Sequence, residues 1–167
     1  MPRRGVFWGL GNVACILSLF LFLLGAAPGT GGQIDFPKTI GKLTLQRVVT
    51  RQQAQNQLNS IHDEKIPVAG AAIGYYQGEG IPQVVAWWSR ASNESEAGDQ
   101  LDRMVAKIRR GGSFPYTDYQ ALERKGISVH SFLGRGLMHY TYRRGEYVYW
   151  IEAPADIIGG VFDEVMK

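Results

Sequence analysis

Three strand-like segments follow one another near the end of the chain with only tight turns between them. They span residues 127–133, 137–143 and 146–152, and the turns read Gly-Arg-Gly and Arg-Arg-Gly-Glu. Parallel strands need a crossover of about a dozen residues or more, whereas antiparallel strands can be joined by turns this short. The segments therefore predict an antiparallel sheet, and any amphipathic helix of the domain must pack against one of its faces.

The upstream sequence adds strands and helices to this sheet. Alternating apolar residues predict further strands at 43–49, 68–77 and 83–90. Helices are predicted at 51–62, at 94–110 and after Pro154, whereas 113–126 reads as a loop with one short turn. We therefore expect one α+β domain with an antiparallel sheet of about five or six strands and two or three helices packed mainly on one face.

The helix at 94–110 has the most complete set of signals. Asn93 can cap it, because Glu96 follows three residues later. One helical stripe is apolar and should face the sheet; it contains Ala97, Leu101, Met104, Val105 and Ile108. Asn93-Glu94-Ser95 also fits a glycosylation sequon, but we favour the capping interpretation.

The N-terminus predicts a membrane segment. Arg3 and Arg4 precede residues 6–27, which contain no charged side chain and are long enough to cross a bilayer. The segment is either a signal peptide, which would release a secreted domain, or an uncleaved anchor. We favour the anchor, because Pro28 follows the better cleavage position. Residues 28–33 then form a flexible joint, and 34–167 form a domain on the periplasmic or extracellular side.

Charge and composition exclude several classes of function. The net charge is +3, and it falls to +1 without Arg3 and Arg4, so no domain-wide basic field predicts a nucleic-acid partner. Cys15, the single cysteine, lies inside the apolar segment, which leaves the exported domain without disulfide or thiol chemistry. The sequence has no phosphate-binding loop or dinucleotide-binding motif, and we expect no cofactor.

Histidine chemistry offers only a weak route to catalysis. His62, Asp63 and Glu64 are adjacent, so their side chains diverge unless the backbone curls around an ion. His130 and His139 lie on neighbouring predicted strands but lack a third ligand. We therefore expect no metal site and no catalytic group. A small exported hydrolase using His62 with Asp63 or Glu64 remains the least favoured alternative.

The last predicted hairpin is rich in aromatic residues. A turn at Arg144-Gly145 would place four tyrosines on one face of the sheet, with Tyr142 opposite Tyr147 and Tyr140 opposite Tyr149. His139 and Trp150 would lie on the other face. Trp87 and Trp88 are adjacent in a strand, so one of them extends the tyrosine face. This face is either a structural ladder of cross-strand pairs or a binding surface.

Together these features favour a non-enzymatic exported domain, anchored in the membrane through residues 6–27. Its expected partner is a protein, a peptide or a glycan of the cell envelope, bound through Tyr140, Tyr142, Tyr147, Tyr149, Trp87 and Trp88. His139 and Trp150 form the candidate site on the opposite face. The alternative is a sensor or carrier with an apolar ligand cavity between the sheet and its helices.

Overall fold

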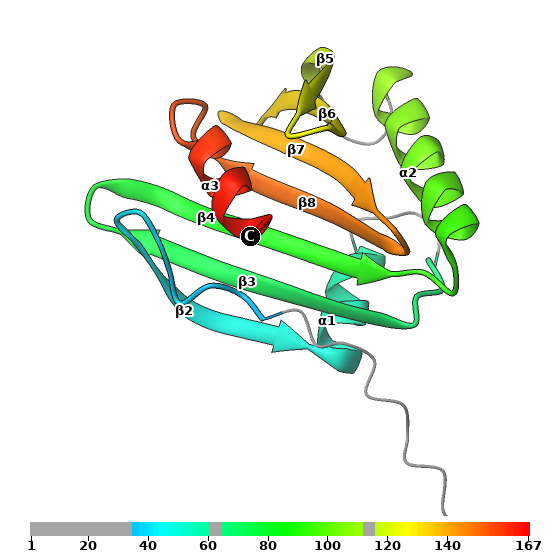
Figure 1. The fold of residues 1–167 in the computed structure, drawn as a ribbon, viewed down its shortest axis with the longest axis horizontal. Coiled ribbons are helices and arrows are strands. Elements are labelled where there is room, and N and C mark those ends of the chain that lie inside the picture. Colours follow the sequence, from blue (N-terminus) through cyan, green and yellow to red (C-terminus); the bar gives the residue numbers. More distant parts are fainter. Residues whose placement is uncertain (1–34, 61–64, 112–115) are drawn as a thin grey trace, which may run out of the picture. The chain divides into compact units, whose positions relative to one another are not determined.

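The computed structural model describes residues 35–60, 65–111 and 116–167, which form one antiparallel sheet of eight strands with three helices (Figure 1). The strands are β1 (Thr39–Ile40), β2 (Leu43–Thr50), β3 (Gly70–Gly78), β4 (Ile81–Arg90), β5 (Thr117–Arg124), β6 (Ile127–Gly134), β7 (Leu137–Arg144) and β8 (Tyr147–Ala153). The helices are α1 (Arg51–Ser60), α2 (Glu94–Arg109) and α3 (Ile158–Val165). The α+β class expected from the sequence is confirmed.

The sheet consists of two meanders joined along one seam. Its strand order is β1-β2-β3-β4-β8-β7-β6-β5, so the second meander enters in reverse order and its last strand pairs with β4. Every other neighbouring pair of strands is consecutive in the sequence. The seam runs from the pair Val85–Glu152 to the pair Arg90–Tyr147 and brings Trp87 opposite Trp150.

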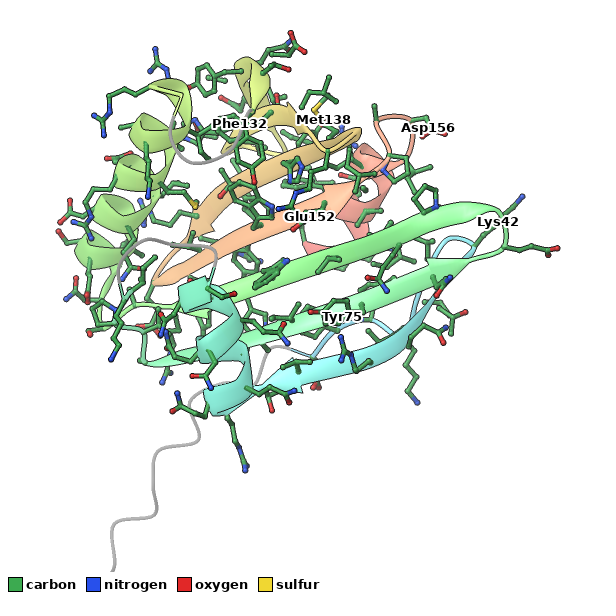
Figure 2. All side chains as sticks on the ribbon, turned by 180° about the vertical axis from the view of Figure 1, so that it is seen from behind. Lys42, Tyr75, Phe132, Met138, Glu152 and Asp156 are labelled. Carbon is green, nitrogen blue, oxygen red and sulfur yellow. The ribbon has the colours of Figure 1, made fainter. Side chains whose placement is uncertain are left out.

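The helices cover both faces of the sheet. We call the side that bears Trp87, His139 and Trp150 the tryptophan face, and the side that bears Tyr140, Tyr142, Tyr147 and Tyr149 the tyrosine face. On the tryptophan face, α1 packs on β2 and β3, and α2 packs on β7 and β8. The third helix, α3, lies on the tyrosine face, where Phe162 meets Tyr142 edge-on with ring centroids 4.9 Å apart. Figure 1 shows α3 in front of the sheet, and Figure 2, seen from behind, shows α1 in front.

The predicted strand count was too low, because two strands were missed. The loop expected at 113–126 contains β5, whose sequence TDYQALER has no β-branched residue after Thr117 and resembles a helical turn. Pairing with β6 makes it a strand at the edge of the sheet, where most of its side chains are exposed. The other missed strand, β1, has only two residues and pairs with Leu43 and Thr44.

The structure confirms the prediction for α2 in detail. The Asn93 side chain accepts a hydrogen bond from the Glu96 amide at 2.9 Å, and the Glu96 carboxylate accepts one from the Ser92 amide at 3.1 Å. This reciprocal arrangement is a capping box in which the N-cap amide is replaced by that of the preceding residue. The predicted apolar stripe packs on Phe132 and Val148 of the sheet, and its residues are buried or partly buried.

The last helix starts four residues later than Pro154 and contains a Gly159-Gly160 pair. Gly159 permits a close contact, because a Cβ here would lie 3.0 Å from the Arg124 guanidinium, which donates a 3.0 Å hydrogen bond to the Gly159 carbonyl. The same guanidinium forms a 2.7 Å ion pair with Asp163, one turn further along α3. Arg124 therefore ties the last helix to the edge strand β5.

The last hairpin has a different register from the expected one. Its turn is Gly145-Glu146, so that Tyr142 lies opposite Tyr149 and Tyr140 lies opposite Ile151. A shift of two residues changes the partners but preserves the faces, because side chains alternate with period two. The four tyrosines consequently share one face, as predicted, although the predicted pairs are wrong.

The expected membrane segment at 6–27 and the adjacent groups His62, Asp63 and Glu64 lie outside the described residues. Among the residues that the structure does describe, no helix has the length and apolar character needed to span a bilayer.

Candidate binding cleft on the tryptophan face

The structure divides the candidate site residues between the two faces of the sheet. Trp87, His139 and Trp150 come together on the tryptophan face, since Trp87 pairs with Trp150 across the seam. Trp88 lies on the tyrosine face, where it is paired with Tyr149 and contacts Tyr147 edge-on at 5.7 Å between ring centroids.

The tyrosine face is largely a packed interior under α3. Tyr142 is 0% exposed and Tyr149 is 8% exposed, and their rings stack in parallel with centroids 4.9 Å apart. A surface of four displayed tyrosines therefore does not form, because Phe162 and the stacking partner enclose Tyr142. Tyr140 and Tyr147 keep part of their surface exposed.

The tryptophan face contains a small cleft between α1 and α2. Its volume is about 50 Å³, and its walls are predominantly apolar. The cleft is lined by Leu58, Ile66, Trp87, Ser89, Gln100, Met104, Val148 and Trp150, together with Trp88, whose ring packs on the tyrosine face. Leu58 and Ile66 belong to α1 and the segment that follows it, whereas Gln100 and Met104 belong to α2, so the cleft separates two helices that are held apart on one sheet.

Two polar contacts fix the walls of this cleft. The Gln100 amide donates a 3.2 Å hydrogen bond to the Pro67 carbonyl, which ties α2 to the segment that leads into β3. The Gln55 amide donates to the Ile66 carbonyl at 3.0 Å and holds the same segment to α1. These hydrogen bonds hold α1, α2 and the segment before β3 in fixed positions around the cleft.

His139 is a buried, neutral residue of this face. It is 2% exposed, its Nδ1 accepts a 3.1 Å hydrogen bond from the Trp150 indole N–H, and its Nε2 lies 3.0 Å from the Gly134 carbonyl. The indole can only donate, which assigns the ring proton to Nε2. Burial lowers the pKa of His139, against the opposing effect of its bond to Gly134. Both ring nitrogens are therefore occupied, and the imidazole orients Trp150.

Glu152 lies directly opposite His139 on the neighbouring strand. Burial raises the pKa of its carboxyl group, and the positive charge of Arg135 partly opposes this shift. Figure 2 shows Glu152 on the same side of the sheet as α1. The strand β8, which contributes Trp150 to the cleft floor, thus also carries a partly buried carboxylate.

The second described histidine is also engaged. His130 Nδ1 lies 3.2 Å from the Tyr119 hydroxyl, and burial lowers the pKa of His130. His130 lies on the tryptophan face. Phe132, two residues further along β6, lies on the same face and pairs with His139 on β7. Within the described residues, no three His, Cys, Asp or Glu side chains are grouped so that they could hold a metal ion. His62, Asp63 and Glu64 are outside this part of the chain.

Sequence reasoning singled out the floor of the cleft but not its walls. Met104 was expected in the core stripe of α2, and Gln100 carried no signal. Ile66 precedes Pro67 in a connection between elements, where nothing in the local pattern distinguishes it. Only the three-dimensional placement of α1 beside α2 brings these residues together.

No protein-family model, curated protein or solved structure matches this chain.

Proposed function

We propose that the chain is a membrane-tethered binding domain without catalytic activity, and that its cleft receives an apolar side chain of a protein or peptide partner in the cell envelope. Residues 6–27 supply the tether, and the domain lies on the periplasmic or extracellular side. The observation that carries this proposal is the apolar cleft between α1 and α2, with the cross-strand pair Trp87 and Trp150 on its floor.

The lining of the cleft favours a peptide over a glycan. A sugar presents several hydroxyl groups that need hydrogen-bond partners when buried. Apart from the indole N–H groups of its tryptophans, the lining has two polar side chains, Ser89 and Gln100, and the Gln100 amide already donates to Pro67. Tryptophan and methionine, in contrast, are enriched in protein interfaces. Trp87, Trp150 and Met104 supply this chemistry.

The size of this cleft disfavours an engulfed small molecule at this site, although a wider and more open hollow of about 700 Å³, lined largely by polar side chains, lies beside α1. Sites for drug-sized ligands enclose roughly 300–1,000 Å³. A cleft of about 50 Å³ accommodates part of one side chain. A partner that inserts a single apolar group while the rest of its surface contacts the flanking helices fits this geometry better than an engulfed ligand.

The state of His139 supports binding over catalysis at this site. A general base needs a ring nitrogen that can reach a substrate. The Trp150 indole occupies Nδ1 of His139, and the Gly134 carbonyl occupies Nε2. The histidine thus positions the tryptophan that forms the cleft floor.

Site-specific photo-crosslinking in the cells that produce the full chain tests the proposal. A photoreactive side chain at Met104, in the lining, should give a discrete adduct with one partner protein. The same group at the exposed neighbour Arg103 should not. Ser89→Leu should abolish the Met104 adduct by filling the cleft, with folding checked by circular dichroism. Equal labelling at both positions, or an adduct that survives the filled cleft, contradicts the proposed site.

The tether and the location need a separate test. Alkaline phosphatase fused after Lys167 is active only when it is exported, so the fusion should be active and should stay with the membrane after alkaline extraction. Activity in the medium would show a cleaved signal, whereas an inactive fusion beside an active cytoplasmic reporter would contradict export.

A further inference from the structure

The positive charge of the described domain is concentrated in its first segment. Residues 35–60 carry four basic side chains and one carboxylate, Asp35, and have a net charge of +3. The next carboxylates in the sequence are Asp63 and Glu64, and residues 35–167 together carry sixteen basic and fifteen acidic side chains, a net charge of +1. The four basic residues are Lys38, Lys42, Arg47 and Arg51, and all of them are exposed.

These residues follow one edge of the sheet. β1 pairs only with Leu43 and Thr44, so the remainder of β2 forms the edge. Lys42 lies in the turn at one end of β2, where Figure 2 shows it at the tip of the sheet, and Arg51 follows the other end. We call this surface the basic edge, and it comprises Lys38, Lys42, Arg47, Arg51 and Val48.

An exposed apolar residue accompanies the charges. Val48 is 43% exposed, and among the described residues it is the large hydrophobic side chain that is left on the surface. None of the ion pairs between described side chains involves the four basic residues of this edge. Arg47 and Val48 are adjacent in β2 and point to opposite faces, and the Arg47 guanidinium lies 4.2 Å from the centroid of the Tyr75 ring. Exposed basic side chains along one edge, accompanied by an exposed apolar residue, match the requirements of an anionic lipid surface.

Charged residues on an edge strand also prevent edge-to-edge association, and that role alone would explain some of them. The opposite edge allows a comparison. β5 and the turn after it carry Asp118, Glu123, Arg124 and Lys125, two charges of each sign. Charged side chains can therefore protect the β5 edge from edge-to-edge association without any net charge. The excess of positive charge at the basic edge needs another explanation.

We infer that the basic edge docks on anionic lipids in the exported leaflet of the bilayer that holds the tether. This inference rests on the proposed anchoring through residues 6–27. Only the seven residues 28–34 separate that segment from Asp35, and they span at most about 25 Å when fully extended. The tether makes docking an intramolecular event, so that a weak contact per residue is sufficient. Docking along the β2 edge presents the sheet edge-on to the bilayer and leaves the cleft on the tryptophan face accessible to a partner.

A solvent-sensitive dye on the full chain in lipid vesicles tests this inference. In a Cys15→Ser background, the dye is attached at Gln46→Cys on the basic edge or at Ala121→Cys on β5; both native residues are exposed. In vesicles of phosphatidylcholine with about 30% phosphatidylglycerol, the dye at 46 should shift to the blue and resist a neutral aqueous quencher. The dye at 121 should not change, and neither should respond in phosphatidylcholine alone.

Charge variants show whether the basic residues cause the effect. Lys38→Gln with Lys42→Gln should lower the ratio of docked to undocked chains roughly thirtyfold, since each basic residue near such a surface contributes about a factor of five. Arg103→Gln with Arg110→Gln removes the same charge from exposed positions in α2 and at its C-cap and should leave the ratio unchanged. About 0.5 M salt should release the native edge through screening.

Alkaline extraction of the same vesicles separates the two ways in which the inference can fail. A chain that resists extraction but shows an unchanged dye at 46 overturns docking and leaves the tether intact. A chain that is extracted overturns the tether and, with it, the docking that depends on it. Protection at 46 that is equal in neutral and anionic vesicles also overturns the inference, because charge would not be recognised.

Discussion

The indole N–H of Trp150 donates a 3.1 Å hydrogen bond to Nδ1 of His139 on the neighbouring strand. His139 is buried and its second nitrogen is bonded to Gly134, so no water can replace the indole without a rearrangement. The position of the cleft floor thus depends on a polar contact within an aromatic cluster that also includes Phe132 and Tyr116.

Trp150→Phe should destabilise the domain by about 1–3 kcal/mol, because it leaves the His139 acceptor buried without a donor. Stacking on Phe132 is retained by the new ring. Trp88→Phe is the matched control, since the described residues provide no hydrogen-bond partner for the Trp88 indole N–H. Urea denaturation of both variants measures the difference. Equal losses would show that ring volume, and not the hydrogen bond, determines the effect.

The stability of the native chain should decrease as the pH falls below about 6.5. Unfolded histidine takes up a proton near this pH, whereas burial lowers the pKa of folded His139 and His130. The unfolded state then binds more protons, and the free energy of unfolding declines. Glu152, with its raised pKa, has the opposite effect toward pH 4.5.

His139→Gln isolates the contribution of His139 to this dependence. Denaturation midpoints of the native chain and the variant between pH 7.5 and 5.5 should converge toward the acid end. A constant difference over that range would mean that His139 does not titrate between the folded and unfolded states.

Tyr142→Phe should be neutral or stabilising. The Tyr142 hydroxyl is buried and finds no hydrogen-bond partner among the described residues, and burial strongly raises the pKa of this phenol. Tyr76→Phe is the counterpart, because the Tyr76 hydroxyl donates to the Pro37 carbonyl at 3.0 Å. That variant should lose about 0.5–1.5 kcal/mol. Thermal denaturation would refute the argument if Tyr142→Phe were the more damaging change.

Leu101→Ala should lower the free energy of unfolding by about 2–5 kcal/mol, as is typical for large-to-small changes in a packed core. Leu101 is 7% exposed and packs in the cluster that contains Phe132 and Val148. The exposed residue Arg103, two positions further along α2, provides the comparison as Arg103→Ala. If both variants lowered the free energy of unfolding by a similarly small amount, the placement of this stripe in the core would be wrong.

The two glycines of α3 should respond differently to alanine. A methyl group at Gly160 meets no atom within 4 Å, so Gly160→Ala should stabilise the helix by up to about 1 kcal/mol. At Gly159 the new carbon would lie 3.0 Å from the Arg124 guanidinium and would force it to move. Gly159→Ala should therefore gain less, or nothing, in chemical denaturation. An equal gain at both positions would show that the Arg124 contact has no energetic weight.

Local patterns were sufficient for most of the fold. The stripe from Ala97 to Ile108 and the caps around it define α2 by themselves, and alternation placed the four tyrosines on one face. β5 could not be found in this way, because an edge strand needs no apolar face and its identity depends on pairing with β6. The register of the last hairpin depended on which two of four turn residues form the corner, and the sequence permits more than one solution.

The candidate site was harder to predict than the fold. The aromatic hairpin drew attention to Tyr142 and Tyr149; Phe162 of α3 packs on Tyr142, and Tyr149 stacks on Tyr142. No sequence signal states on which face a terminal helix will pack. The cleft depends on the distance between α1 and α2. Strand order sets this distance, because α1 packs on β2 and β3 whereas α2 packs on β7 and β8, so no local segment predicts it.

The pairing of β4 with β8 determines the order in which parts of the sheet can fold during synthesis. All other strand pairs form between neighbours in the sequence, but Trp87 must wait for Trp150, 63 positions later in the chain. Long-range pairing of this kind is slow relative to hairpin formation. A nascent chain can therefore assemble each meander early, while the floor of the cleft is completed only when the two meanders meet. The proposed binding site is thus complete only after β8 has been synthesised, at the step that also closes the sheet.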